Sequence, residues 1–193
     1  ITEDNDKVGT DIHNSAILCF DGKIQFVQHK TLIPNYDVFD EMRYFDSAES
    51  VSVFEFKDEK LGISICEDIW NDADYWYRRR YHKDPIQDLL KQNASVLINI
   101  SASPYSYGKR GARKEMLSVL TKKDKIPLAY VCCVGAQTDL IFDGASMWEQ
   151  GKNFPPELAW AQDWSWWLRA RAKCWPTIRM AMLCGKSGFH RKF

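Results

Sequence analysis

Residues 61–70 have the sequence LGISICEDIW, which predicts a central strand of the fold and contains a candidate catalytic residue. Its first five residues form a short apolar run, which predicts a buried β-strand. Cys66 closes this strand, and a helix or loop is expected to begin directly after it. A thiol at the rim of a sheet can have its pKa lowered by helical N–H groups, which can also stabilise an oxyanion. A buried, inert cysteine is the ordinary alternative, so spacing alone makes Cys66 only a candidate nucleophile.

The segments around this strand alternate between strand and helix patterns. Apolar runs predict further strands at residues 15–20, 24–29, 51–56, 95–101, 127–134 and 139–142. Helical patterns cover residues 85–93, with Leu89 and Leu90 on one face, and 109–124, with Met116, Leu117 and Leu120 buried. Short turns such as Asp21-Gly22-Lys23 join some strands, and helices join others. The sequence therefore predicts an α/β fold with both antiparallel and parallel strand pairs.

Two charged residues are further candidates for a site. Lys30 ends the expected strand 24–29 and could offer a fixed positive charge to a developing oxyanion, although a solvated lysine is the commoner case. Glu41 follows eleven residues later and is either a catalytic carboxylate or the ordinary partner of Arg43. His29 and His82 would suit a Cys–His pair, but nothing in the sequence connects either to Cys66.

Cysteine spacing and the chain start narrow the class of protein. The six cysteines contain no CxxC pattern and no Cys/His cluster, so no metal site is expected. Cys132 and Cys133 are adjacent in an expected buried strand, where a disulfide would be strained, and reduced cysteines favour a cytoplasmic location. The sequence contains no apolar run of about 18 residues, so no membrane span is expected. The start Ile1–Asp4 has no signal-peptide character, and it lacks Met, so a natural N-terminus upstream is expected.

The formal net charge of zero hides a division of the chain near Met147. Residues 1–147 contain 18 basic and 23 acidic side chains, whereas residues 148–193 contain 8 basic and 3 acidic ones. The same C-terminal stretch holds six of the eight tryptophans. We therefore expect two parts, an enzyme-like body of residues 1–147 and an atypical basic, Trp-rich tail of residues 148–193.

Three interpretations of the tail compete. Trp160, Trp164 and Trp167 have helical spacing beside basic residues, which suits a helix that binds an anionic membrane or a partner groove. Stacking tryptophans would also suit a nucleic-acid arm. The third interpretation is a frame-shifted or spliced-on, disordered sequence. The abrupt change of composition and the missing turn-and-strand pattern favour this third interpretation, so neither membrane nor nucleic acid is expected as a partner.

Four segments in one order resemble a known family. They are HKTLIPNYDVFDEMRYF (29–45), GISICEDIW (62–70), LINISASPYSYGK (97–109) and VGAQTDLIFDGAS (134–146). Together they resemble the nitrilase-type glutaminase domain of glutamine-dependent NAD synthetases, over about residues 12–146. The lysine and cysteine motifs are shared by all carbon–nitrogen hydrolases. The tract around Tyr36, with CEDIW and ISASPY, points to the NAD synthetase branch.

The resemblance implies a nitrilase-like α-β-β-α sandwich, here incomplete at both ends, with residues 1–147 as a partial carbon–nitrogen hydrolase domain. It also implies a Glu–Lys–Cys triad in which Cys66 is the nucleophile and Lys30 the catalytic lysine. Glu41 matches an additional glutamate that holds the lysine. The positions that match substrate contacts in the family are Tyr36, Glu67, Trp70, Ser103 and Lys109.

The implied activity is hydrolysis of the glutamine amide, with the ammonia used for ATP-dependent conversion of deamido-NAD to NAD. The glutaminase part needs no cofactor, whereas ATP, Mg and deamido-NAD belong to a synthetase domain that this sequence does not contain. Glutamine, that domain and further copies in a homo-oligomer are the expected partners.

The sequence departs from the family pattern at both ends. The general-base glutamate of the triad belongs upstream of Lys30, and Glu3 has neither the context nor the distance for that role. We therefore expect the chain alone to hydrolyse glutamine poorly. Two alternatives stay open: a stand-alone nitrilase-like amidase for another small amide, and an inactive truncated domain whose tail binds a membrane or partner.

Overall fold

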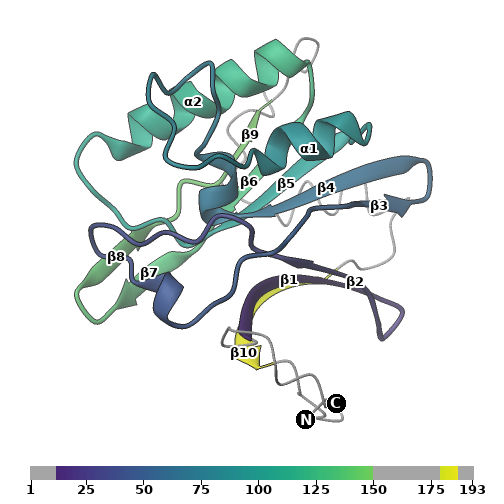
Figure 1. Ribbon diagram of the computed structural model, residues 1–193, viewed down its shortest axis with the longest axis horizontal. Coiled ribbons are helices and arrows are strands. Elements are labelled where there is room, and N and C mark those ends of the chain that lie inside the picture. The colour runs from purple at the N-terminus through teal and green to yellow at the C-terminus, as the bar shows by residue number, and fades with distance from the viewer. Residues whose placement is uncertain (1–11, 150–178, 187–193) are drawn as a thin grey trace.

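A computed structural model describes residues 12–149 and 179–186 of the 193-residue chain (Figure 1). Its elements, in chain order, are β1 (Ile12–Phe20), β2 (Lys23–His29), the 3₁₀ turn η1 (Glu41–Arg43), β3 (Val53–Phe56), β4 (Glu59–Ile65), the 3₁₀ turn η2 (Cys66–Ile69), α1 (Pro85–Lys91), β5 (Val96–Ser101), α2 (Lys109–Asp124), β6 (Leu128–Cys132), β7 (Val134–Gln137), β8 (Leu140–Asp143), β9 (Met147–Glu149) and β10 (Arg179–Lys186). The strands and helices expected from periodicity are confirmed. The differences are small: α1 ends at Lys91, and the strand expected at 127–134 is interrupted at Cys133.

The central sheet has the strand order β3-β4-β5-β6-β9. β4, β5 and β6 run parallel, and β3 and β9 pair antiparallel at the two edges. The mixture of parallel and antiparallel pairs expected from the sequence is therefore present. Because β4, β5 and β6 are parallel, their carboxyl ends meet at one edge of the sheet, where Cys66 and the residues after Ser101 lie.

The helices α1 and α2 cover one face of this sheet, as Figure 1 shows. Alternation in β5 explains the packing, since Leu97 faces the helices and Ile98 faces the other way. The helix-side core contains Leu89, Met116, Leu117 and Leu120, all at most 1% exposed. Asp84 caps α1 by accepting the N–H of Gln87, and Pro85 occupies its first turn.

A second sheet, β10-β1-β2, lies on the opposite face of the central one (Figure 1). Ala16 and Leu18 of β1 pack against Leu61, Ile63 and Ile65 of β4. The described residues therefore form three layers, helices on a sheet on a sheet, of the α-β-β-α sandwich expected from the resemblance. The turn between β1 and β2 has Asp21 and Gly22 at positive φ, 50° and 68°, which is the conformation of a two-residue hairpin loop.

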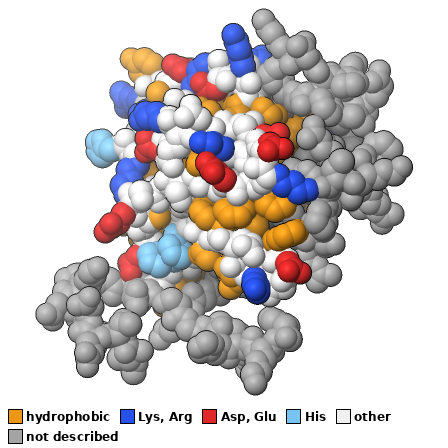
Figure 2. Space-filling model, turned by 90° about the vertical axis from the view of Figure 1, so that its right-hand side faces the viewer, with side chains coloured by type: hydrophobic (Ala, Val, Ile, Leu, Met, Phe, Trp, Pro, Cys, Tyr) orange, Lys and Arg blue, Asp and Glu red, His pale blue; other side chains and the backbone are white. Residues whose placement is uncertain are grey.

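Phenylalanines extend the contact between the two sheets. Phe20 lies 5.5 Å from Phe56, and Phe26 lies 5.4 Å from Phe54, measured between ring centroids. Figure 2 shows the side of the molecule that is on the right in Figure 1, with a band of hydrophobic side chains between charged groups.

No helix of the described residues is long and apolar enough to cross a membrane.

Part of the expected tail also lies within the described residues. Trp148 and Glu149 belong to β9 and pair with β6, so the division expected near Met147 falls within a strand. β10 pairs antiparallel with β1 along eight residues, although no strand pattern was recognised there. Trp160, Trp164 and Trp167 lie outside the described residues, as does Glu3.

Candidate active site

Cys66 lies where β4 turns into η2, at the carboxyl edge of the central sheet. Its φ is 45°, a left-handed conformation that costs a non-glycine residue roughly 1–3 kcal/mol and needs support from its surroundings. The side-chain amide of Asn99 on β5 supplies part of that support by donating to the Cys66 carbonyl at 3.4 Å. Cys66 is therefore a strained residue at the end of a rigid strand.

Lys30 lies directly after β2 and is 1% exposed. Its ammonium donates to both carboxylate oxygens of Glu41, at 2.8 and 2.7 Å. Arg43 pairs instead with Asp40, at 3.2 Å on the exposed side of η1. Of the two partners considered for Glu41, the geometry selects Lys30. A buried lysine whose ammonium donates to both oxygens of one carboxylate supplies a positive charge at a fixed position.

The charge of Lys30 acts on the Cys66 thiol. Burial raises the pKa of this thiol above its ordinary value, while Lys30 and a backbone hydrogen bond from Ala102 lower it; Glu67 and Glu41 act in the raising direction. The net shift of the Cys66 pKa is upward, because burial outweighs the lowering effects of Lys30 and the Ala102 backbone.

A cavity of about 340 Å³ opens beside Cys66. Its wall includes all five residues predicted to contact substrate, namely Tyr36, Glu67, Trp70, Ser103 and Lys109. They come from the loop after β2, from η2 and the residue that follows it, from the segment after β5 and from the start of α2. The fold thus brings together residues that are up to 73 positions apart in the sequence.

Glu67 of this cavity wall accepts hydrogen bonds from two tyrosines. Its Oε1 accepts the hydroxyl of Tyr36 at 2.7 Å and that of Tyr81 at 3.2 Å. Burial and these hydrogen bonds to Glu67 raise the pKa of both tyrosines, so both hydroxyls stay protonated donors. Lys109 lies 5.8 Å from the centroid of the Trp70 ring, close enough for a cation–π interaction.

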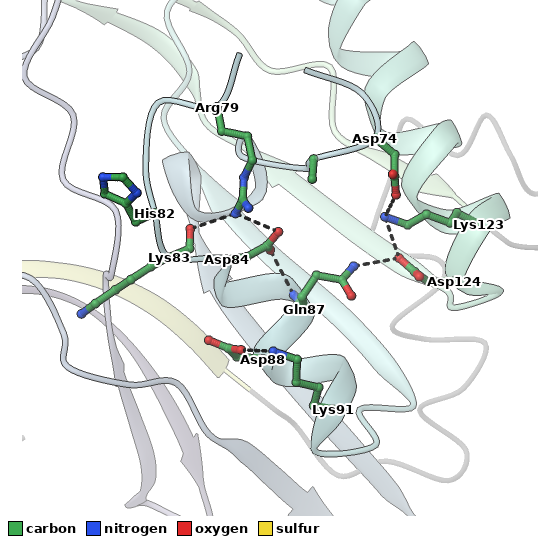
Figure 3. A pocket seen from close by; sticks show the side chains of 11 residues that line it. Asp74, Arg79, His82, Lys83, Asp84, Gln87, Asp88, Lys91, Lys123 and Asp124 are labelled. Carbon is green, nitrogen blue, oxygen red and sulfur yellow. Dashed lines mark hydrogen bonds and ion pairs between the residues drawn. The ribbon is translucent and has the colours of Figure 1, made fainter. Parts of the chain in front are cut away.

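A second, larger cavity of about 600 Å³ lies between α1 and α2 and contains none of these residues (Figure 3). Its charged side chains largely pair with one another, for example Arg79 with Asp84, and Lys123 with Asp74. His82 lies there and His29 hydrogen-bonds to Ser15, so neither histidine forms a pair with Cys66. Within the described part of the chain, no group of His, Cys, Asp and Glu could hold a metal ion.

Comparison with known proteins gives relatives that match about 70% of the chain. A glutamine-dependent NAD(+) synthetase from Synechocystis is 47% identical over 133 residues, which are 69% of this chain and 24% of that protein. The enzyme of the same name from Thermotoga maritima is 40% identical over 138 residues, 71% of this chain and 22% of that protein. The chain is homologous to one segment of glutamine-dependent NAD(+) synthetases. It spans about a quarter of the length of these synthetases.

Solved structures agree with this relationship to NAD(+) synthetases. The synthetase from Acinetobacter baumannii matches with a TM-score of 0.64 and 38% identity, over 72% of this chain and 24% of that one. A carbon–nitrogen hydrolase from Helicobacter pylori, 22% identical with a TM-score of 0.61, shares the fold over 72% of this chain and 50% of its own. The nitrilase-like fold expected from the sequence is confirmed. No family model matches the chain.

Several cavity residues of this synthetase homologue were missed from the sequence. Trp76, Arg78 and Arg80 also line the cavity, and the Arg80 guanidinium lies 3.8 Å from the Tyr36 ring centroid. The sequence of this segment is that of a charged surface loop without helix or strand periodicity, so its residues were not recognised as part of a site. The backbone of Ala102 was missed for a different reason, since a hydrogen bond to a thiol leaves no trace in residue type.

Proposed function

We propose that the chain carries the cysteine-dependent glutaminase site of a glutamine-dependent NAD(+) synthetase, a site that releases ammonia from L-glutamine in the full-length enzyme. One observation carries this proposal: the Lys30 ammonium, clamped by Glu41, acts on the Cys66 thiol at the wall of a cavity. A nucleophile beside a fixed cation suits attack on a carbonyl, because the cation stabilises the negative oxygen that forms.

The proposed reaction has two halves. The Cys66 sulfur attacks the side-chain carbonyl carbon of glutamine, and the carbonyl electron pair moves to oxygen, where Lys30 stabilises it. The carbon–nitrogen bond then breaks, and the thiol proton ends on the departing nitrogen, which leaves as ammonia. Water attacks the resulting thioester, giving glutamate and restoring the thiol. No metal or organic cofactor is needed for this cycle.

The polarity of the cavity favours glutamine over a neutral amide. Glutamine carries an ammonium and a carboxylate at its α-carbon. The cavity offers the Glu67 carboxylate to the first and the basic side chains of Lys109, Arg78 and Arg80 to the second. Charge-assisted hydrogen bonds of this kind are stronger than neutral ones. A stand-alone amidase for an uncharged amide would have no use for both signs of charge.

The relatives suggest what the ammonia serves. They are named glutamine-dependent NAD(+) synthetases, and this chain matches about a quarter of their length. The ammonia would pass to a synthetase domain that uses ATP and Mg to convert deamido-NAD to NAD. Glutamine and that domain are accordingly the proposed partners.

The test is covalent trapping with 6-diazo-5-oxo-L-norleucine. The diazo carbon takes up the thiol proton, the Cys66 sulfur then attacks this carbon and displaces nitrogen gas, and a stable thioether forms. We expect labelling of the Cys66 peptide, seen by mass spectrometry, and protection by L-glutamine. The variant Cys66→Ser should take up no label, whereas Cys133→Ser, which changes an exposed thiol, should label like the parent chain.

Two results would overturn the proposal. One is an absence of labelling in chain shown to be folded by circular dichroism. The other is protection by butyramide equal to that by L-glutamine, which would favour the amidase that acts on a neutral amide.

A further inference from the structure

Asp68 is 1% exposed and accepts three backbone hydrogen bonds. Its Oδ1 accepts the N–H of Thr31 at 3.0 Å and that of Leu32 at 2.7 Å. Its Oδ2 accepts the N–H of Ile65 at 3.0 Å. No other side chain is needed to satisfy this carboxylate, because backbone donors occupy both oxygens.

The three residues that donate to Asp68 are close neighbours of Lys30 and Cys66 in the sequence. Thr31 and Leu32 directly follow Lys30, and Ile65 directly precedes Cys66. These two backbones come from different sheets, since Lys30 follows β2 and Cys66 follows β4. One carboxylate therefore ties the chain next to the cation to the chain next to the thiol.

We propose that Asp68 is a positioning residue that fixes Lys30 relative to Cys66. The inference rests on the proposed function, because it concerns the geometry of the same two groups. Asp68 itself touches neither the reacting thiol nor the cavity, whose wall does not include it. It acts through the backbone on both sides.

The cost of burying the Asp68 carboxylate indicates that this residue has a role besides stabilising the fold. A carboxylate is costly to bury, and the three N–H donors together with the charge of Lys30 offset only part of that cost. Desolvation accordingly raises the pKa of Asp68 to about 6. Asp68 also supports the strained turn at Cys66, since its bond to Ile65 closes the first turn of η2.

A positioning role and a merely electrostatic role predict opposite changes in the thiol. Removing the negative charge of Asp68 lowers the pKa of the Cys66 thiol if the charge acts through space alone. Releasing the clamp lets Lys30 move away, so the same pKa rises, because Lys30 is the largest influence that lowers it.

The experiment measures alkylation of Cys66 by iodoacetamide between pH 6 and 10, followed by mass spectrometry of its peptide. The variants are Asp68→Asn, Lys30→Met and the double variant, with Asp84→Asn as the matched control. Asp84 is another carboxylate that accepts a backbone N–H, but it is only partly buried and caps α1 outside the cavity of Cys66. Urea unfolding of each variant establishes that it is folded under the assay conditions.

We expect Asp68→Asn to shift the alkylation profile to higher pH and to slow the reaction at pH 7.5 by about tenfold or more. The shift should vanish in the Lys30→Met background, because Asp68 acts through Lys30. Asp84→Asn should leave the profile in place. A profile that moves to lower pH, or an equal shift with and without Lys30, would overturn the inference.

Two features keep the outcome clear. If Asp68→Asn does not fold, Asp68→Glu retains the charge and moves the carboxylate by one methylene, so the clamp alone predicts a shift. Iodoacetamide is not a glutamine analogue, so a failure of the proposed function would leave this test unaffected, and the converse holds as well.

Discussion

The ammonium of Lys30 contacts both oxygens of the Glu41 carboxylate, at 2.8 and 2.7 Å, while only 1% of the lysine is exposed. The pair joins the end of β2 to η1, eleven residues later. Because the lysine is buried, its charge needs the compensation that this ion pair supplies. The neighbouring pair of Asp40 and Arg43 has both side chains more than half exposed, at 56% and 69%.

The two pairs predict very different costs when one carboxylate is neutralised. Glu41→Gln leaves a buried ammonium without its counter-ion, and we expect the free energy of unfolding to fall by about 2–4 kcal/mol. Asp40→Asn is the matched control, with an expected change below about 0.5 kcal/mol because water screens the exposed pair. Urea denaturation at pH 7 measures both. Equal effects of the two substitutions would show that Lys30 does not depend on Glu41.

A second prediction concerns the packing of the sheet against the helix layer. A Cβ added at Gly62 would lie 2.9 Å from the Cδ2 of Leu97 and 3.2 Å from the Cβ of Ala94. Gly62→Ala should therefore destabilise the protein by about 1–3 kcal/mol through overpacking. Gly111 in α2 has nothing within 4 Å of such a Cβ, so Gly111→Ala should stabilise by about 0.5–1 kcal/mol. Thermal unfolding of the two variants should show melting temperatures that move in opposite directions.

Much of the fold could be predicted because periodicity and turns act locally. The Asp21-Gly22 turn fixes the first hairpin, and the buried stripe Met116, Leu117 and Leu120 fixes the inner face of α2. Arg113 on the same helix is different, since a charged residue there is expected outside. It is fully buried and donates to Asp143 and to the carbonyl of Gly144. Such a partner belongs to the tertiary structure, which no local pattern encodes.

The candidate site likewise has residues that local sequence patterns reveal and residues that only the tertiary structure reveals. Cys66 and Lys30 were found because they stand at strand ends within motifs, and Glu41 because it belongs to the same motif tract. Asp68 looks like a solvated residue of a turn, and only the packing of two sheets shows that backbone donors surround it. The burial that raises the pKa of the Cys66 thiol is likewise a property of the assembled layers.

A third prediction tests the tyrosine pair at Glu67. Tyr36→Phe removes the shorter of the two hydrogen bonds to this carboxylate and leaves only that of Tyr81. A hydrogen bond to a charged group contributes about 1.5–3 kcal/mol, so protection of Cys66 by L-glutamine should need at least tenfold more glutamine. Tyr107→Phe is the control, because this tyrosine is 99% exposed. Similar protection curves for Tyr36→Phe and the parent chain would separate Glu67 from glutamine binding.

The last prediction uses pH to examine Asp68. Burial raises the pKa of its carboxyl from an ordinary 3.8 to about 6 in the folded protein, so the folded state binds this proton more tightly than the unfolded chain does. The resulting stabilisation is fully present below about pH 4 and is lost as the pH rises through about 6. Asp68→Asn has no such proton. The stability of the parent chain relative to this variant should therefore decrease by up to about 3 kcal/mol between pH 4 and pH 7.

Urea denaturation of both proteins across this range measures the difference, and other titrating groups cancel because both proteins contain them. Curves that run parallel from pH 4 to pH 7 would mean that Asp68 titrates alike in the folded and unfolded states. A carboxylate that destabilises the fold at neutral pH, yet holds the backbones beside Lys30 and Cys66, is expected where the geometry of a site outweighs stability.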